Sequence, residues 1–220
     1  MMAFRDGADA GRRLAGALTQ LRDDNVVVLG LPRGGVPVAA EVARELRAPL
    51  DVIVVRKVGV PWQPELAMGA VGEGGIGVVD AGVTRLTGVD PQQVRAAQAG
   101  ARAELRDRAR ALRGHRPPVD LTGRTAVIVD DGVATGSTAR AACWVARLQG
   151  AVRVVLAVPV APPDAVRALS EVADEVVCLL EPADFGAVGR FYDDFRPVPD
   201  AEVLDLLDHA SPGRRSGRPG

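Results

Sequence analysis

Two adjacent acids follow an apolar run in a setting that suits phosphate and diol chemistry. Residues 125–129 are apolar, Asp130 and Asp131 come next, and residues 132–138 read Gly-Val-Ala-Thr-Gly-Ser-Thr. Small residues let backbone N–H groups approach an anion, and the N-terminus of a following helix adds about half a positive charge. Carboxylates suit sugar hydroxyls, or Mg²⁺ held through its waters. The combination predicts a sugar-phosphate site, with the phosphate in the loop 132–138 and the diol on the acids.

The segments that must position these residues alternate between apolar runs and stretches of helical spacing. Five apolar runs predict buried strands: 26–31, 51–55, 125–129, 152–158 and 175–180. Five stretches predict helices: 8–22, 36–46, 137–149, 163–172 and 202–209. This alternation predicts an α/β fold with a doubly wound, mainly parallel five-stranded sheet. Ligands bind beyond the carboxyl ends of such strands, so the loops after Leu31, Val55 and Val129 are the candidate site.

Three further segments extend this core within a single domain, residues 1–210. Residues 56–77 are rich in Gly and Pro and predict a flexible lid loop with a hairpin, whose strands span 67–71 and 76–80. Asp90 and Pro91 begin an inserted helix over about 90–113, with Asp as N-cap and Pro at the first position. Residues 181–209 predict a C-terminal cap that forms a small hood. The polar tail 211–220 is expected to be disordered.

Composition excludes several classes of protein. A net charge of −1 over 220 residues argues against a basic nucleic-acid face. No apolar run reaches the roughly 18 residues of a membrane span, and the N-terminus lacks an apolar signal-peptide core. Cys143 and Cys178 lack metal-site spacing and predict reduced core thiols. We therefore expect a cytoplasmic protein with neither nucleic acid nor membrane as a partner.

Simpler interpretations of the acidic motif are weaker. Asp130 and Asp131 could belong to a helix N-cap region, with the glycines only shaping a turn. Two acids directly after a buried strand, followed by the full Ala-Thr-Gly-Ser-Thr run, favour a ligand site instead. The chain contains neither GxxxxGK[ST] nor GxGxxG, which excludes a Walker A loop and a dinucleotide fingerprint.

The stretch Val127–Thr138 resembles the signature with which type I phosphoribosyltransferases bind 5-phosphoribosyl-1-pyrophosphate (PRPP). In that family the two acids hold the ribose 2′ and 3′ hydroxyls, and the loop holds the 5′-phosphate. The resemblance implies that Asp130 and Asp131 are catalytic residues that also hold Mg²⁺, through water. It assigns the phosphate to the following loop residues: Gly132, Val133, Ala134, Thr135, Gly136, Ser137 and Thr138.

Two other segments resemble the pyrophosphate side of the same site. Gly30–Gly35 is similar to the family's pyrophosphate loop, which implies binding by Gly34 and Gly35 and a catalytic Arg33. Val54–Pro61 resembles the Arg-Lys segment of adenine and orotate phosphoribosyltransferases, which implies that Arg56 binds substrate and that Lys57 is catalytic. Lys57 is the only lysine among 27 basic side chains. Taken alone, each segment could be a turn or strand end with solvated basic residues.

Nearly the whole chain resembles a group of stand-alone bacterial phosphoribosyltransferase-like proteins, whose acceptor is not settled. Ala134 stands where hypoxanthine-guanine enzymes usually carry an Asp near purine N7, which argues against a 6-oxopurine. Trp62, Glu65 and Tyr192 are candidate acceptor residues. Packing of the cap, or a solvated loop acid, would explain the same residues.

The resemblance implies Mg²⁺-dependent transfer of 5-phosphoribosyl from PRPP to a nitrogen acceptor, such as a nucleobase, with release of pyrophosphate. The expected transition state resembles an oxocarbenium ion. A non-catalytic PRPP or nucleotide sensor on the same fold is the alternative, and a sugar-phosphate hydrolase or phosphorylase is a third. The sequence does not fix an oligomeric state, and the resemblance allows a homodimer.

Overall fold

A parallel sheet organises the molecule. The computed structural model describes residues 3–22, 24–114 and 116–210. The five strands are β1 (Val26–Gly30), β2 (Leu50–Val52), β6 (Thr125–Val129), β7 (Arg153–Val160) and β8 (Glu175–Leu180). They pair in the order β2-β1-β6-β7-β8, and every pairing is parallel. The predicted α/β fold with a five-stranded parallel sheet is confirmed.

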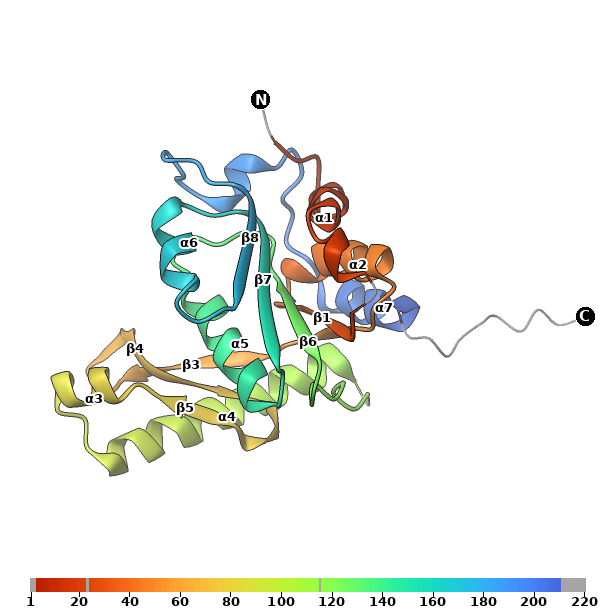
Figure 1. Ribbon diagram of the computed structural model, residues 1–220. Helices are drawn as coiled ribbons and strands as arrows, with labels where there is room; N and C mark the ends of the chain where they lie inside the picture. The colour runs from red at the N-terminus through yellow and green to blue at the C-terminus, as the bar shows by residue number, and fades with distance from the viewer. Residues whose placement is uncertain (1–2, 23, 115, 211–220) are drawn as a thin grey trace, which may run out of the picture.

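Helices cover both faces of this sheet (Figure 1). α1 (Gly7–Gly16), α2 (Gly35–Leu46) and α7 (Asp200–Ala210) lie on one face, and α5 (Ser137–Leu148) and α6 (Pro163–Leu169) lie on the other. Successive strand residues point to opposite faces. Val127 accordingly joins the first hydrophobic cluster and Ile128 the second. Both faces of the strands are buried, which explains why their sequences are continuous apolar runs.

A second, antiparallel sheet follows the second strand of the core. It contains β3 (Val55–Val60), β4 (Gln63–Gly72) and β5 (Gly77–Val79), in that order, and it packs between α4 (Pro91–Arg113) and α5. Residues 56–77 were predicted as a loop with short strands at 67–71 and 76–80. β3 begins at Val55 and β4 at Gln63, and the two strands pair along their length, so the segment is mostly a β-hairpin. The 3₁₀ turn η2 (Glu73–Gly75) then connects β4 to β5. Its glycines and prolines concealed the strands.

The inserted helix is confirmed, and a short helix precedes it. α4 begins with a capping box, in which Asp90 and Gln93 each accept a hydrogen bond from the other's backbone N–H. The sequence analysis missed α3 (Ala81–Thr87), whose N-cap is Asp80 and whose C-cap is the left-handed Gly88. These two cap residues were the available signals.

The first helix is shorter than predicted. α1 ends at Gly16, and the 3₁₀ turn η1 (Thr19–Leu21) follows it. α6 also ends early, at Leu169 rather than at residue 172. The C-terminal cap contains the 3₁₀ turn η3 (Val188–Phe191) and α7. The tail 211–220 lies outside the described residues. Cys143 is buried and Cys178 is partly buried, and both are free thiols, as expected.

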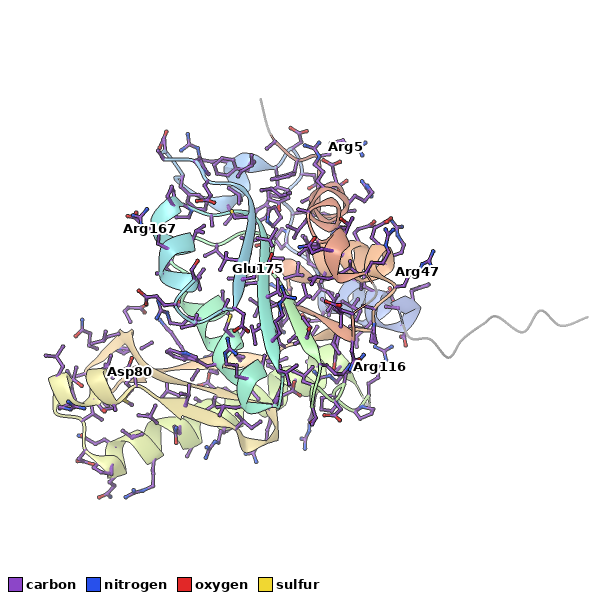
Figure 2. The ribbon with its side chains drawn as sticks, in the orientation of Figure 1. Arg5, Arg47, Asp80, Arg116, Arg167 and Glu175 are labelled. Carbon is purple, nitrogen blue, oxygen red and sulfur yellow. The ribbon has the colours of Figure 1, made fainter. Side chains whose placement is uncertain are left out.

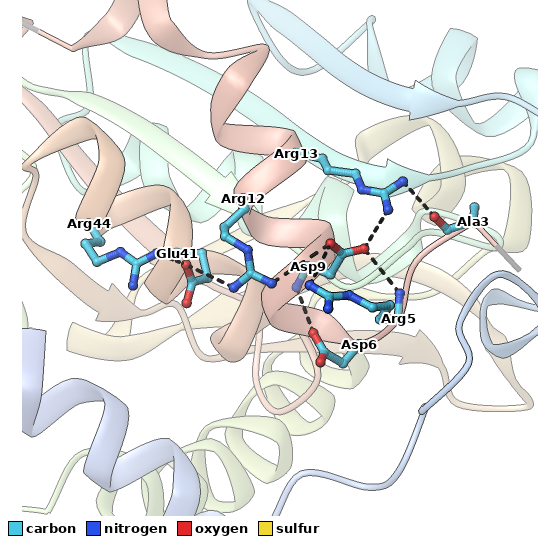
Figure 3. A network of polar contacts seen from close by, with 8 residues as sticks. All are labelled: Ala3, Arg5, Asp6, Asp9, Arg12, Arg13, Glu41 and Arg44. Carbon is cyan, nitrogen blue, oxygen red and sulfur yellow. Dashed lines mark hydrogen bonds and ion pairs between the residues drawn. The ribbon is translucent and has the colours of Figure 1, made fainter.

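A buried acid ties α1 to its surroundings (Figure 3). Asp9 is 7% exposed and pairs with three arginines, Arg5, Arg12 and Arg13. Arg12 also reaches Glu41 of α2. Burial alone would raise the pKa of Asp9, but the backbone hydrogen bond from Arg5 and the three charges hold that pKa below its ordinary value. The network fixes α1 against α2, the helix that follows the loop at residues 31–34. Among the described helices, none is both long and apolar enough to cross a membrane.

Candidate active site

Three loops leave the sheet at one edge. Gly30 pairs with Val129 at the ends of β1 and β6, and the N–H of Leu31 donates to the carbonyl of Val129 over 2.8 Å. Ile53, just past β2, donates to the carbonyl of Gly30 over 3.1 Å. The chain therefore leaves β1, β2 and β6 side by side, as the parallel order β2-β1-β6 requires. The strand predicted at 51–55 ends at Val52, however, and Val55, where the third loop was predicted to begin, is the first residue of β3.

Two helix N-termini at this edge have no side-chain cap. Gly34 is the N-cap of α2, Gly136 is the N-cap of α5, and neither helix receives a side-chain cap hydrogen bond from the described residues. By contrast, α1, α3 and α4 each begin with an aspartate that accepts from first-turn N–H groups. Gly136 has a φ of 76°, which favours glycine. In α2 the N–H groups of Gly35 and Val36 already donate to the carbonyls of Leu31 and Arg33, and Pro37 has no N–H. The first-turn N–H groups of α5 have no acceptor among the described residues, so they are left for a ligand such as a phosphate.

The loop at residues 31–35 touches the acidic motif. A Cβ on Gly34 would overlap the carboxylate of Asp131, and one on Gly35 would lie 2.6 Å from the carbonyl oxygen of Val129. Only glycines allow this approach of the two loops. The peptide bond between Pro32 and Arg33 is cis.

Both carboxyl groups of the motif are partly buried and share one small space. Burial, and next the charge of Asp131, raise the pKa of Asp130 well above its ordinary value. Burial raises the pKa of Asp131 to about 6. Two neighbouring carboxyls with raised pKa values are stabilised in their charged form by a ligand that supplies positive charge or hydroxyl donors.

Tyr192 closes this space from the C-terminal cap. Its hydroxyl donates to the backbone carbonyl of Asp131 over 2.5 Å, and the residue is 3% exposed. Burial, followed by the charges of Asp131 and Asp130, raises its pKa. The phenol therefore acts as a donor in the protein as it stands.

Each of the three predicted cations is paired with an acid. Arg33 lies 3.6 Å from Asp200 of α7, and Lys57 lies 2.9 Å from Glu65 across the β3–β4 hairpin. Arg56 pairs with Glu104 of α4. Sequence reasoning missed Asp200 and Glu104, because contacts this distant along the chain leave no local signal.

Three cavities surround the edge. The first, of about 680 Å³, is lined by Arg33, Asp131, Tyr192 and residues of the cap. The second, of about 620 Å³, includes Arg56 and Lys57 of β3 with Ser137 and Thr138 of α5. The third, of about 550 Å³, joins Pro32, Arg56 and Thr138. The structure thus brings Arg33 toward the acids, and Arg56 and Lys57 toward the start of α5.

The remaining predicted residues are placed unevenly. In the loop 132–138, Ala134 and Thr135 are exposed, whereas Val133 is buried. Gly132 packs closely, since a Cβ there would lie 2.6 Å from Val188 of the cap. Of the acceptor candidates, Tyr192 lines the 680 Å³ cavity. Trp62, at the β3–β4 turn, is 56% exposed and lines none of the three cavities, and Glu65 reaches the site only through Lys57.

The two carboxyl groups of the acidic motif fit a magnesium ion that binds together with a phosphorylated ligand. Within the described residues, no group of three or more His, Cys, Asp or Glu side chains could hold a metal by itself. Mg²⁺ is commonly held by one or two carboxylates together with substrate phosphates and waters. Asp130 and Asp131 provide such a pair.

The sheet order defines an α/β protein, and the uncapped N-terminus of α5 beside the two acids is its candidate anion site. A family model for the phosphoribosyl transferase domain matches residues 4–196. The chain therefore belongs to the phosphoribosyl transferase family, and its fold is the type I fold of that family.

Known proteins agree with this assignment. Two Mycobacterium tuberculosis proteins, from strains CDC 1551 / Oshkosh and H37Rv, are each 56% identical over 210 residues and are provisionally named phosphoribosyl transferases. The matches cover 96% of this chain but 47% of each relative, so the chain spans about half their length. The crystal structure of TT1426 from Thermus thermophilus matches with a TM-score of 0.89 at 50% identity, covering 96% of this chain and 100% of that one.

Proposed function

We propose that this domain transfers a 5-phosphoribosyl group from PRPP to a nitrogen nucleophile and releases pyrophosphate. The observation that carries the proposal is the meeting of three features at one sheet edge: the glycine-capped N-terminus of α5, the glycine turn at Gly34 and Gly35, and two carboxyls with raised pKa values. A ligand that carries phosphate at both ends and a diol between them satisfies all three features. PRPP is such a ligand.

The residues divide into two sides. The phosphate loop and the N-terminus of α5 bind the 5′-phosphate, and Asp130 and Asp131 orient the ribose through its 2′ and 3′ hydroxyls. The loop at Gly34 and Gly35 receives the pyrophosphate, together with Arg33, Arg56 and Lys57. Each of these three cations exchanges its acidic partner for a pyrophosphate oxygen.

In the reaction the bond from C1 to the pyrophosphate oxygen breaks, and a bond from the acceptor nitrogen to C1 forms. The acceptor proton leaves to solvent or to pyrophosphate. The protein contributes orientation of the ribose, neutralisation of the leaving group and exclusion of water. Mg²⁺, when bound with PRPP, supplies further neutralisation of the pyrophosphate charge. The 680 Å³ cavity, which reaches Asp131 from beneath the cap, receives the acceptor.

Binding and chemistry are tested separately. PRPP with Mg²⁺ should raise the melting temperature, and Asp130→Asn with Asp131→Asn should abolish the shift. Asp164→Asn, an exposed acid on α6, is the control and should retain it. No shift at millimolar PRPP would refute the proposal. A screen of nucleobases and small amines for pyrophosphate release then names the acceptor, whereas binding without release by any of them would favour a PRPP sensor.

A further inference from the structure

A row of arginines follows one side of the inserted helix, on the side of the β3–β5 layer away from α5. Arg102, Arg106 and Arg110 are spaced four residues apart on α4, so they share one face of the helix. They line a cavity of about 430 Å³ between α4 and the turn at Glu73–Gly75. Two more arginines, Arg113 and Arg116, complete the lining. Figure 2 shows Arg116 at the opposite end of this layer from Asp80.

Protein groups balance only part of the positive charge in this cavity, since Arg113 pairs with two acids and Arg116 pairs with Asp208 of α7. Glu73 is the only acid among the described residues that line it, and Glu73 already pairs with Arg113. Within the described part of the chain, Arg102, Arg106 and Arg110 make no ion pair, although most arginines elsewhere in it do. Like charges at i and i+4 destabilise a helix by about 0.2–0.5 kcal/mol per pair. The row therefore costs stability in the free protein.

Two guanidinium nitrogens in the same lining lack an acceptor among the described residues. Nε of Arg102 and Nη1 of Arg116 are buried and make no hydrogen bond there. A buried donor without an acceptor is unfavourable. Both side chains line the cavity that has excess positive charge. A bound anion would compensate this charge and supply acceptors for the two nitrogens.

The opposite wall of the cavity is open backbone. Gly74 and Gly75 have φ angles of 75° and 77°, which favour glycine. A Cβ on Gly75 would meet nothing within 4 Å among the described residues. Leu105 and Ala109 form an apolar floor. The cavity thus lies between an exposed glycine turn and a positively charged face of α4.

We propose that this cavity binds a small polyphosphate anion, with Arg102, Arg106 and Arg110 as its ligands. Guanidinium groups bind phosphate oxygens through paired hydrogen bonds, and a row with about 6 Å between successive members matches a chain of phosphoryl groups better than a single one. Arg113 remains held by Asp51 of β2 and serves as a fixed positive background.

The site is separate from the transferase site. None of its five arginines lines the cavities that contain Asp131, Lys57 or Thr138. The proposal therefore does not rest on PRPP chemistry, and either can fail alone.

Amide hydrogen exchange with inorganic triphosphate provides a local test on the full chain. We expect protection of residues 72–75 and 102–114, in addition to any protection at 130–138. The triple variant Arg102→Gln, Arg106→Gln, Arg110→Gln should lose the first protection and weaken the corresponding Kd at least tenfold. A control with the same change of charge, Arg47→Gln, Arg85→Gln, Arg95→Gln, should keep both.

Several outcomes would overturn the proposal. These are protection confined to 130–138, equal weakening in the two triple variants, or no protection at millimolar triphosphate. The same experiment with a nucleoside triphosphate shows whether the nucleoside is also recognised. An affinity equal to that of inorganic triphosphate means that the site recognises phosphates alone. A higher affinity means that the apolar floor also contacts the nucleoside. Protection of 102–114 by a single-stranded oligonucleotide but not by triphosphate would also refute a small-anion site.

Discussion

The hydroxyl of Tyr192 donates a 2.5 Å hydrogen bond to the backbone carbonyl of Asp131. The bond joins the C-terminal cap to the loop that carries the two acids. The tyrosine ring also contacts Phe4 and Phe195, with ring centroids 5.3 and 5.1 Å away. The cap is thereby fastened to the acidic motif on one side and to the N-terminal segment on the other.

Tyr192→Phe isolates the hydroxyl from the ring. We expect a loss of about 1 kcal/mol in unfolding free energy, because the carbonyl of Asp131 loses its donor, and a several-fold weaker affinity for PRPP with Mg²⁺. Urea unfolding and PRPP titration measure the two effects. Phe185→Leu, in the same cap, should reduce stability without changing affinity. If both variants left PRPP binding intact, the tyrosine would be a packing residue only.

The raised pKa of Asp131 predicts a stability that depends on pH. Between about pH 4 and pH 6 the folded protein keeps a proton that the unfolded chain has released, so the ligand-free protein loses stability as pH rises through this window. Asp131→Asn removes the penalty and should stabilise the protein by about 1–2 kcal/mol at pH 7.5, less than the full shift because the carboxyl is partly exposed. At pH 4 the two proteins should be equally stable. Urea unfolding at both values tests this, and a pH-independent difference would contradict it.

The order of the elements was readable from the sequence, because a parallel sheet buried on both faces leaves continuous apolar runs, as at 125–129. The second sheet was only partly readable. Its strand β3 contains exposed Arg56 and Lys57 and an interior Gly59, which resemble a loop. The acidic motif stood out because its pattern is local. The partners Asp200 and Glu104 did not, since they come from remote helices and were typical solvated acids.

Lys57 and Glu65 form a pair that substitution can separate. Lys57→Ala should weaken pyrophosphate binding by roughly tenfold, the loss of one charge contact of about 1.4 kcal/mol, and should leave ribose 5-phosphate binding unchanged. Glu65→Gln removes the competing acid and should keep or tighten pyrophosphate binding. Calorimetric titration with the two ligands measures both. Equal loss of both ligands in Lys57→Ala would place the lysine elsewhere in the site.

Arg113 joins the two sheets through a buried ion pair. It is 4% exposed, its Nε lies 3.0 Å from Asp51 of β2, and it also pairs with Glu73 beside β4. Burial alone would lower its pKa, but the charges of Asp51 and Glu73 raise it.

Arg113→Met should cost about 3–5 kcal/mol in urea unfolding, because it leaves Asp51 charged and unpaired in the core. Arg95→Met, an exposed arginine on the same helix, should change stability by less than about 0.5 kcal/mol. Adding Asp51→Asn to Arg113→Met should recover part of the loss, since it removes the unpaired charge. The recovery is incomplete because Val52 and Val119 donate to different oxygens of Asp51, and the amide oxygen of Asn replaces only one of them. A double variant as unstable as the sum of both singles would show that the pair is not coupled.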